Sequence, residues 1–314
     1  MKLATSTGDF SWYTNSVSEE IRSFKDSKFR YINLEQPGSL PAYFAESDDD
    51  WKRLADEWGN AAADAGVTFV VSHAPCLRMP GSNHLQPADA ETYRANLRAF
   101  RRSIEICHVL NIDRIVVHAC PNGNKEEFYK YNYRFYRDMF DLMEKHQISV
   151  LTENFDYPGL HLSTGDDLRE FIEYVDHPLL AACWDTAHGN MNSETRKISQ
   201  YQNIIAIGDQ LKGLHISDNF GDCHHHSWPF AGIINFDSVM QGLVDVNYDG
   251  YFTFEASYTL LHHKNIPYHR EPWEHNGQIV TKLLDPSIEL KKSAVELLYE
   301  TGKYMLEAYN CFSE

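Results

Sequence analysis

Acidic and imidazole side chains end four short apolar segments of this chain. Glu153 ends ISVLTE, Asp185 ends LLAACWD, His215 ends KGLH and Glu255 ends GYFTFE. When parallel strands alternate with helices in a barrel, residues at the carboxyl ends of the strands lie on one face. Carboxylate and imidazole groups are ligands of divalent cations, and a set drawn from several strands leaves coordination positions for substrate. We therefore expect these four residues to form one metal centre.

The composition of this ligand set bears on which metal it would bind. A carboxylate-rich set favours Mn, Mg or Co, whereas additional imidazoles favour Zn. Sixteen histidines are present, and His73, His118, His188 and His215 all fall at the ends of strand-like segments. The identity of the divalent metal therefore stays open among Mn, Mg, Co and Zn.

Eight β-rich segments alternate with helical patterns along the chain. The strands are expected at residues 2–7, 30–35, 68–73, 114–119, 149–154, 180–185, 213–218 and 251–256. Helices are expected from Ser16, over about 49–64, 88–110 and 125–146, from Ser163 or Thr164 to 175, and over about 194–211, 237–245 and 286–309. Eight strand–helix units predict an α/β protein, a single-domain (β/α)₈ TIM barrel over residues 1–314. The alternative is a doubly wound open sheet, which would not bring strands three to eight to one site.

Three long loops follow the second, seventh and eighth predicted strands, at about 36–48, 218–236 and 256–284. All three lie on the same face as the predicted ligands. Long structured loops are usually functional. The last loop could form a lid or a contact with a second copy in a homo-oligomer; it is rich in aromatic and imidazole side chains, namely Tyr258, His262, His263, Tyr268, His269, Trp273 and His275.

Composition excludes several classes of function. The 314-residue chain has a formal net charge of −17 and no basic stripe, so we expect no nucleic-acid partner. The first residues lack the pattern of a signal peptide, and no run of 18 apolar residues is present, so we expect no membrane association. The six cysteines are scattered and form no C-x-x-C pair, which favours reduced thiols and a cytoplasmic location.

Seven short motifs occur at or near the predicted strand ends. They are SHAP (72–75), VVHA (116–119), TEN (152–154), DTAH (185–188), HISD (215–218), DCHHHSWPFAG (222–232) and FTFEAS (252–257). In this order the chain resembles the xylose isomerase-like barrels, which include sugar isomerases, ketose epimerases and the endonuclease IV family. The resemblance extends from the second strand to the eighth.

The resemblance implies roles for the strand-end residues. Glu153, Asp185, His215 and Glu255 match the residues that bind the catalytic metal in that superfamily. His188, three residues after Asp185, matches a substrate contact of the sugar isomerases and a ligand of a second metal in the endonuclease.

Further histidines match either substrate contacts or ligands of additional metals. His73 and His118 correspond to metal positions of the endonuclease type. In the loop after the seventh strand, His226 matches the loop histidine of the family, and His224 stands where an aspartate is usual. Alternatively, Asp222 and His224 form this pair with a local insertion.

Isomerisation or epimerisation of a sugar requires a base that removes a proton beside a carbonyl and an acid that returns one. A cation between the carbonyl and hydroxyl oxygens stabilises the resulting enediolate. Glu153 and Glu255 could form the acid/base pair. Aromatic residues that could stack on a sugar ring are Trp12, Phe155, Trp184, Trp228 and Phe230.

The loops at the predicted site contain few basic residues, which argues against DNA and against phosphorylated sugars. We therefore predict a metal-dependent isomerase or epimerase of an unphosphorylated carbohydrate or polyol. Ketose 3-epimerases carry arginines after the strand-five Glu and the strand-seven His, and ENFDYPG and HISDNFGD have none. The alternatives are a lyase or dehydratase acting on keto-sugars or keto-glycosides, an endonuclease IV-type phosphodiesterase, and a carbohydrate-binding barrel without catalysis.

Overall fold

A computed structural model describes residues 1–38, 40–45, 47–75, 90–155, 157–191, 197–258, 260, 272–284 and 286–314. Within this part, eight parallel strands form one sheet in the order β7-β6-β5-β4-β3-β2-β1-β8. The strands are β1 (Lys2–Ser6), β2 (Tyr31–Glu35), β3 (Thr68–His73), β4 (Arg114–Val116), β5 (Ser149–Glu153), β6 (Leu180–Asp185), β7 (Leu211–His215) and β8 (Tyr251–Thr253).

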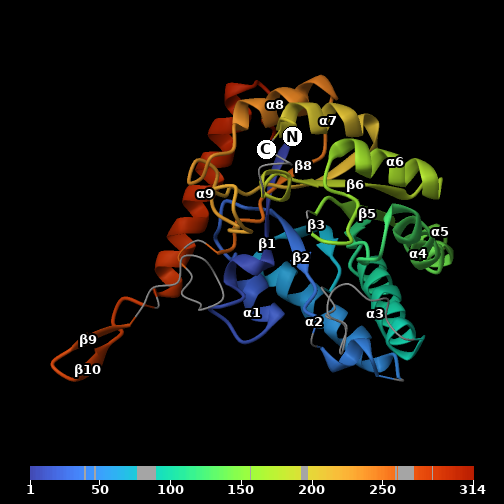
Figure 1. The fold of residues 1–314 in the computed structure, drawn as a ribbon. Helices are drawn as coiled ribbons and strands as arrows, with labels where there is room; N and C mark the ends of the chain where they lie inside the picture. The colour runs from blue at the N-terminus through green and yellow to red at the C-terminus, as the bar shows by residue number, and fades with distance from the viewer. Residues whose placement is uncertain are drawn as a thin grey trace.

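The two edges of this sheet meet just beyond β7 and β8. The backbone nitrogen of Ile216 donates to the carbonyl of Thr253 over 2.8 Å, and that of Glu255 donates to the carbonyl of Ile216 over 3.0 Å. The sheet is therefore a nearly closed barrel, and the helices lie outside it (Figure 1). This confirms the predicted (β/α)₈ fold, and the doubly wound alternative is wrong.

Nine α-helices occur in the part of the chain that the structure describes. They are α1 (Val17–Arg22), α2 (Asp49–Ala65), α3 (Ala90–Val109), α4 (Lys125–Arg137), α5 (Phe140–His146), α6 (Gly165–Val175), α7 (Gln200–Ile207), α8 (Phe236–Asp245) and α9 (Ile288–Ala308). None of them combines the length and apolar character that crossing a bilayer requires.

The helix predicted over 125–146 is wrong, because the chain forms two helices there. The break at Asp138 is stabilised by contacts from α3. Arg101 donates to the Asp138 carbonyl over 2.7 Å, and the Tyr93 hydroxyl donates to the Asp138 carboxylate over 2.8 Å. Contacts from another helix thus replace the local hydrogen bonds that a continuous helix would use.

The helix predicted over 194–211 is also too long. Ser199 caps α7 by accepting from the backbone nitrogen of Gln202, and the helix ends at Ile207, before the cap residue Gly208, whose φ is +59°. A short 3₁₀ turn (Gly208–Gln210) follows, and β7 begins at Leu211 instead of at residue 213. Strands β4, β7 and β8 end three residues earlier than predicted, at Val116, His215 and Thr253.

Inside the barrel, small and branched side chains fill a narrow core. Its buried members are Ala4, Val70, Val71, Val116, Leu151, Ala181 and Cys183. A Cβ at Gly213 would lie 2.6 Å from Leu151 Cδ1, so this glycine leaves the space that Leu151 occupies. This packing closes the barrel below the strand ends and leaves polar residues at the mouth.

A β-hairpin was not expected in the last long loop. It consists of β9 (Trp273–His275) and β10 (Gln278–Val280) and projects away from the barrel in Figure 1. Asn276 and Gly277 connect the strands with φ values of +50° and +74°. Asn-Gly between two short strands is a hairpin signal that the sequence already contained. The predicted loop residues His262, His263, Tyr268 and His269 lie outside the described residues.

A buried carboxyl group on α1 makes stability depend on pH. Ser16 caps this helix as predicted, and Glu20 on its buried side is 9% exposed. Burial and the neighbouring charge of Glu35 raise the pKa of Glu20 to about 7. The folded protein therefore holds the proton more tightly than the unfolded chain. The free energy of unfolding should fall as the pH rises from 4.5 to about 7.

We expect Glu20→Gln to remove this pH dependence, because an amide of the same shape carries no charge. The free energy of unfolding at pH 8 should rise by about 2 kcal/mol, and the gain should vanish near pH 4.5. Urea denaturation at several pH values measures this. Glu57→Gln on the exposed side of α2 is the control. If Glu20→Gln and the wild type were equally stable at pH 8, the raised pKa of Glu20 would not be the source of the pH dependence.

Candidate metal centre and active site

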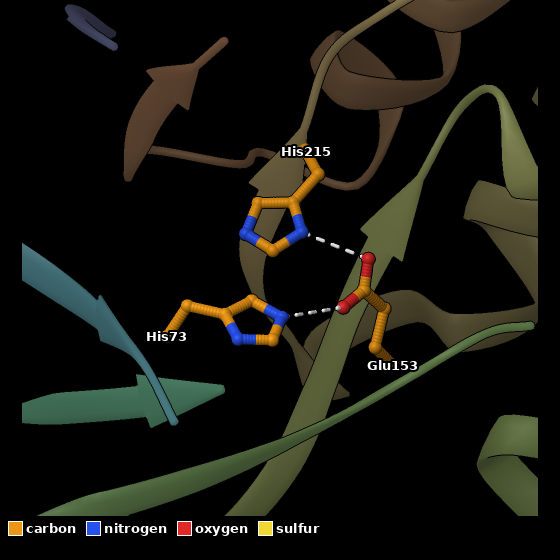
Figure 2. A group of neighbouring side chains, drawn as sticks. All are labelled: His73, Glu153 and His215. Carbon is orange, nitrogen blue, oxygen red and sulfur yellow. Dashed lines mark hydrogen bonds and ion pairs between the residues drawn. The ribbon is translucent and has the colours of Figure 1, made fainter. Parts of the chain in front are cut away.

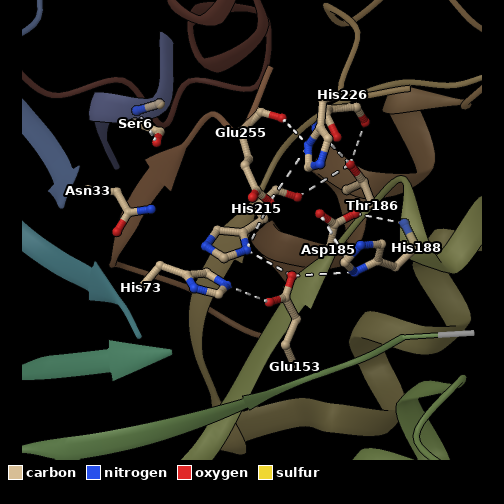
Figure 3. Close-up of polar contacts among 12 residues, drawn as sticks. Ser6, Asn33, His73, Glu153, Asp185, Thr186, His188, His215, His226 and Glu255 are labelled. Atoms are coloured by element: carbon tan, nitrogen blue, oxygen red, sulfur yellow. Dashed lines mark hydrogen bonds and ion pairs between the residues drawn. The ribbon is translucent and has the colours of Figure 1, made fainter. Parts of the chain in front are cut away.

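Consecutive strands place four acidic and imidazole side chains at one point of the barrel mouth. Glu153, Asp185 and His215 are the last residues of β5, β6 and β7, and Glu255 lies two residues beyond β8. One ligand atom from each lies within 4.8 Å of those of the others. Figure 3 shows the four side chains pointing into the same space. The structure thus brings the predicted ligand set together.

Glu153 is the centre of the contacts at this site. Its Oε1 lies 2.8 Å from His215 Nδ1, and its Oε2 lies 3.6 Å from His73 Nε2 (Figure 2). The same Oε2 lies 2.9 Å from His118 Nε2. His215 Nδ1 also lies 3.2 Å from Glu255 Oε2. One imidazole therefore stands between the two candidate acid/base carboxylates.

The imidazoles determine the charge state of Glu153. Burial alone would raise the pKa of this carboxyl group, but His215, His118 and His188 hold the pKa well below its usual range. Each imidazole favours the ionised carboxylate by its positive charge or by a hydrogen bond. Glu153 is therefore negatively charged although it is only 2% exposed.

The pKa of Glu255 is shifted in the opposite direction from that of Glu153. Burial raises its pKa to about 8, and the charges of Glu153, Glu35 and Asp185 add to this effect, while His215 opposes it. Three carboxyl groups share one buried space, so the protein alone does not easily hold all three ionised. A cation among them would favour the ionised form of each.

Polar atoms without partners support the binding of a cation here. Asp185 Oδ2, His188 Nε2 and His215 Nε2 are buried and have no hydrogen-bond partner among the described residues. A buried polar atom without a partner costs free energy, and such atoms at a functional site call for a ligand. Carboxylate oxygens and imidazole nitrogens are ligands of Mn, Mg, Co and Zn. The residues present therefore fit a divalent cation.

The remaining predicted histidines line the same mouth. His188 donates its backbone nitrogen to Asp185 Oδ1 over 2.7 Å, and its ring lies 4.2 Å from that of His224. His226 Nδ1 lies 2.9 Å from the carbonyl of Glu255. Ligand atoms of Asp185, His188 and His224 also lie within 4.8 Å of one another, so a further cation is compatible with this group.

The structure decides how the loop after β7 is arranged. The rings of His224 and His226 lie 3.7 Å apart, and both belong to the cluster at the mouth. Asp222 is exposed, and its Oδ1 lies 3.6 Å from His225. The alternative pair of Asp222 and His224 is therefore wrong. His226 adopts a φ of +42°, a strained conformation for a residue other than glycine, as is common at functional sites.

The predicted aromatic residues separate into different environments. The ring of Phe155 lies 4.3 Å from that of His188, edge to face, at the mouth. Trp12 is 53% exposed and follows the 3₁₀ turn Thr7–Phe10, whereas Trp228 is partly buried against the core. Phe230 is 59% exposed, and its ring lies 5.6 Å from that of Phe236 on α8. Of the predicted stacking residues, Phe155 thus lies directly against a histidine at the mouth.

Trp184 was predicted to stack on the sugar ring, and the structure shows that this prediction is wrong. Its side chain is fully buried in the core outside the barrel, and its indole nitrogen donates to Gln200 Oε1 over 2.8 Å. Successive side chains of a strand point to opposite faces. Because Asp185 faces the mouth, its neighbour Trp184 must face the helices.

A second polar group at the mouth was not predicted. Glu35 Oε1 accepts hydrogen bonds from Ser6 Oγ and Asn33 Nδ2, each over 2.9 Å. Asn33 is fully buried, and its Oδ1 has no hydrogen-bond partner among the described residues. Figure 3 places Ser6 and Asn33 across the mouth from Glu153 and His188. Glu35 ends its strand, so the rule that identified Glu153 could have found it.

The chain matches the xylose isomerase-like TIM barrel family over residues 21–276. An inosose isomerase of Bacillus velezensis is 18% identical over 251 residues, which cover 77% of this chain and 83% of that protein. A probable endonuclease 4 of Citrifermentans bemidjiense is 25% identical over 194 residues, which cover 56% of this chain and 66% of that protein.

Solved structures of the same fold cover nearly the whole chain. A D-tagatose 3-epimerase-like protein superposes with a TM-score of 0.67 at 18% identity and covers 99% of this chain and 98% of its own. An IOLI protein with a bound zinc atom superposes with a TM-score of 0.63 at 17% identity over the full length of both chains. At these identities the likeness establishes the barrel fold.

Proposed function

The chain belongs to the xylose isomerase-like TIM barrel family, and from this premise we propose that it is a metal-dependent sugar isomerase or epimerase. Its substrate would be an unphosphorylated carbohydrate or cyclic polyol. The observation that carries the proposal is the convergence of three carboxyl groups and one imidazole from four consecutive strands, with Glu153 and Glu255 both beside His215. The inosose isomerase and the epimerase-like structure support this class of reaction.

Glu153, Asp185, His215 and Glu255 would hold the cation. When bound, Mn, Mg, Co or Zn would supply electrostatic stabilisation of the negative charge that develops on two neighbouring substrate oxygens. Glu153, Asp185 and His215 are 2%, 0% and 1% exposed, so little water reaches these side chains. Exclusion of water strengthens every charge interaction in the site.

Glu153 and Glu255 would move the proton. One carboxylate removes the proton from the carbon beside the carbonyl, and the other carboxyl group returns a proton to the enediolate. The two roles exchange in the reverse reaction. His215, which lies 2.8 Å from Glu153 and 3.2 Å from Glu255, would keep both carboxyl groups in position.

The surrounding residues suit hydroxyl groups. His188 and His226 on one side, and Asn33 and Glu35 on the other, offer donors and acceptors for a polyhydroxylated ring or chain. Glu35 adds a further negative charge to a mouth that already contains three carboxyl groups. Such a site disfavours a phosphate, which agrees with the net charge of −17.

Two other functions would use the same residues. A lyase or dehydratase acting on keto-sugars would begin with the same removal of a proton. An endonuclease-type phosphodiesterase would require additional cations, and the groups His73–Glu153–His215 and Asp185–His188–His224 could hold them. The endonuclease 4 relative favours this second candidate, whereas the negative charge of the chain opposes binding to DNA.

Hydrogen exchange tests the proposal even when the product has not been identified. We would incubate the protein in D₂O with Mg²⁺, Mn²⁺, Co²⁺ or Zn²⁺ and with ketohexoses, ketopentoses or inososes, and follow the reaction by NMR. We expect deuterium to enter the carbon beside the carbonyl of at least one substrate. A dehydrated product would indicate the lyase. Absence of exchange, together with cleavage of a duplex containing an abasic site, would indicate the phosphodiesterase.

A further inference from the structure

The loop between β7 and α8 presents two different faces. His224 and His226 turn toward the barrel mouth, where their rings lie 4.2 Å from His188 and 4.6 Å from Tyr258, respectively. Cys223 and His225, which alternate with them, meet each other instead: Cys223 Sγ lies 3.1 Å from His225 Nε2. His224 and His226 therefore belong to the site at the barrel mouth. Cys223 and His225 lie on the opposite face of the loop and have no role in that site.

Three donor atoms on this second face lie at distances typical of metal ligands. His225 Nδ1 is 3.7 Å from Cys223 Sγ and 3.6 Å from Asp222 Oδ1, and one ligand atom from each residue lies within 4.8 Å of the others. In tetrahedral zinc sites, with Zn–S of about 2.3 Å and Zn–N and Zn–O of about 2.0–2.1 Å, neighbouring donor atoms lie about 3.4–3.6 Å apart. The two distances from His225 Nδ1 are therefore close to those between two ligands of one zinc ion.

We propose that Asp222, Cys223 and His225 form a second metal site, separate from the centre at the strand ends, which binds a thiophilic divalent cation such as zinc. A thiolate selects Zn over Mg or Mn, which prefer oxygen ligands. His225 is 3% exposed, whereas the Asp222 side chain is 68% exposed, so the cation enters from solvent on the carboxylate side. Water completes the four-coordinate site.

Binding at this site exchanges a proton for the metal. The Cys223 thiol loses its proton to solvent, and the resulting thiolate forms the bond to the cation. The bound metal ties three of four consecutive residues together. His224 lies between two of these ligands and His226 directly follows the last one, so the site would hold the loop that presents both imidazoles to the barrel mouth. The inference does not depend on which reaction the mouth catalyses.

Cobalt titration tests the inference. We would saturate the full-length protein with Mg²⁺, add Co²⁺, and record the near-ultraviolet charge-transfer absorption of a cobalt–thiolate bond. We expect this band in the wild type and in Cys311→Ser, a matched control in which another partly buried thiol is removed. We expect no band in Cys223→Ser. Asp222→Asn, a substitution of an exposed side chain, should weaken Co²⁺ binding at least about tenfold.

Two results would overturn the inference. A wild-type protein that shows no cobalt–thiolate band would mean that Cys223 and His225 only share a hydrogen bond. A band that persists in Cys223→Ser would place the thiolate elsewhere. Circular dichroism of each variant in the presence of a chelator separates loss of the site from loss of the fold.

Discussion

Glu153→Gln and Glu255→Gln should each lower turnover at least about 10²-fold while the barrel remains folded. Glutamine keeps the size of the side chain and removes its ability to accept a proton from substrate or to return one. Both carboxyl groups contact His215, at 2.8 and 3.2 Å, and both belong to the predicted ligand set. Each substitution should therefore also weaken metal binding.

The loss of acid/base function can be separated from the loss of metal binding. Turnover is measured on the substrate found by deuterium exchange, at saturating metal, with the metal content determined in parallel. Glu57→Gln on the exposed side of α2 is the control and should leave turnover unchanged. Near wild-type turnover in either site variant, with metal bound, would show that the acid/base assignment is wrong.

Removal of the metal should abolish activity and lower the melting temperature. Among the described residues, the centre contains three carboxyl groups in one buried space and buried polar atoms without partners, which a cation would stabilise. At a metal concentration a thousandfold above Kd, this binding contributes about 4 kcal/mol, or about 8 °C in a chain of this size. Chelation followed by differential scanning calorimetry measures the loss, and re-addition of metal should reverse it.

The affinity of the metal should depend on pH. Glu255, whose pKa is about 8 without metal, must lose its proton before it can act as a ligand. His215 must lose a proton too, and although burial lowers its pKa, Cys183, Glu153 and Glu255 raise that pKa well above its usual value. Apparent affinity should therefore increase as the pH rises from 6 to 8. Isothermal titration with Mn²⁺ at several pH values, with proton release determined from buffers of different ionisation enthalpy, measures this. An affinity independent of pH between 6 and 8 would contradict the ligand role of Glu255.

The number of cations separates the candidate functions. We expect one tightly bound cation at the strand ends, because His224 is a neutral imidazole where the resembling endonucleases have a carboxylate, and extra cations require extra negative charge. Metal analysis should be done on Cys223→Ser, in which the loop site is removed. About three Zn per chain in this variant would favour the phosphodiesterase function over the isomerase function.

The order of the strands and the polar residues near their carboxyl ends were predictable from the sequence, although the bounds of several strands were not. Apolar β-rich segments followed by helical patterns predict parallel strands, and the carboxyl ends of such strands in a barrel share one face whatever the details of packing. The convergence of Glu153, Asp185, His215 and Glu255 follows from chain order alone. The same rule also covers Glu35, which ends β2.

Other features depend on contacts between distant parts of the chain. The helix breaks after α4 because Arg101 on α3 donates to the Asp138 carbonyl. This contact joins residues far apart in the chain, so the sequence around Asp138 could not predict it. The arrangement of His224 and His226 depends on contacts with Glu255, just beyond β8, and with His188, just beyond β6. Even the charge of Glu153 is set by imidazoles from three other strands and loops. The sequence alone determined which residues reach the mouth, because a strand has only two faces and a barrel only two ends. The tertiary structure decided their contacts, charges and partners, because these depend on distances between residues far apart in the chain.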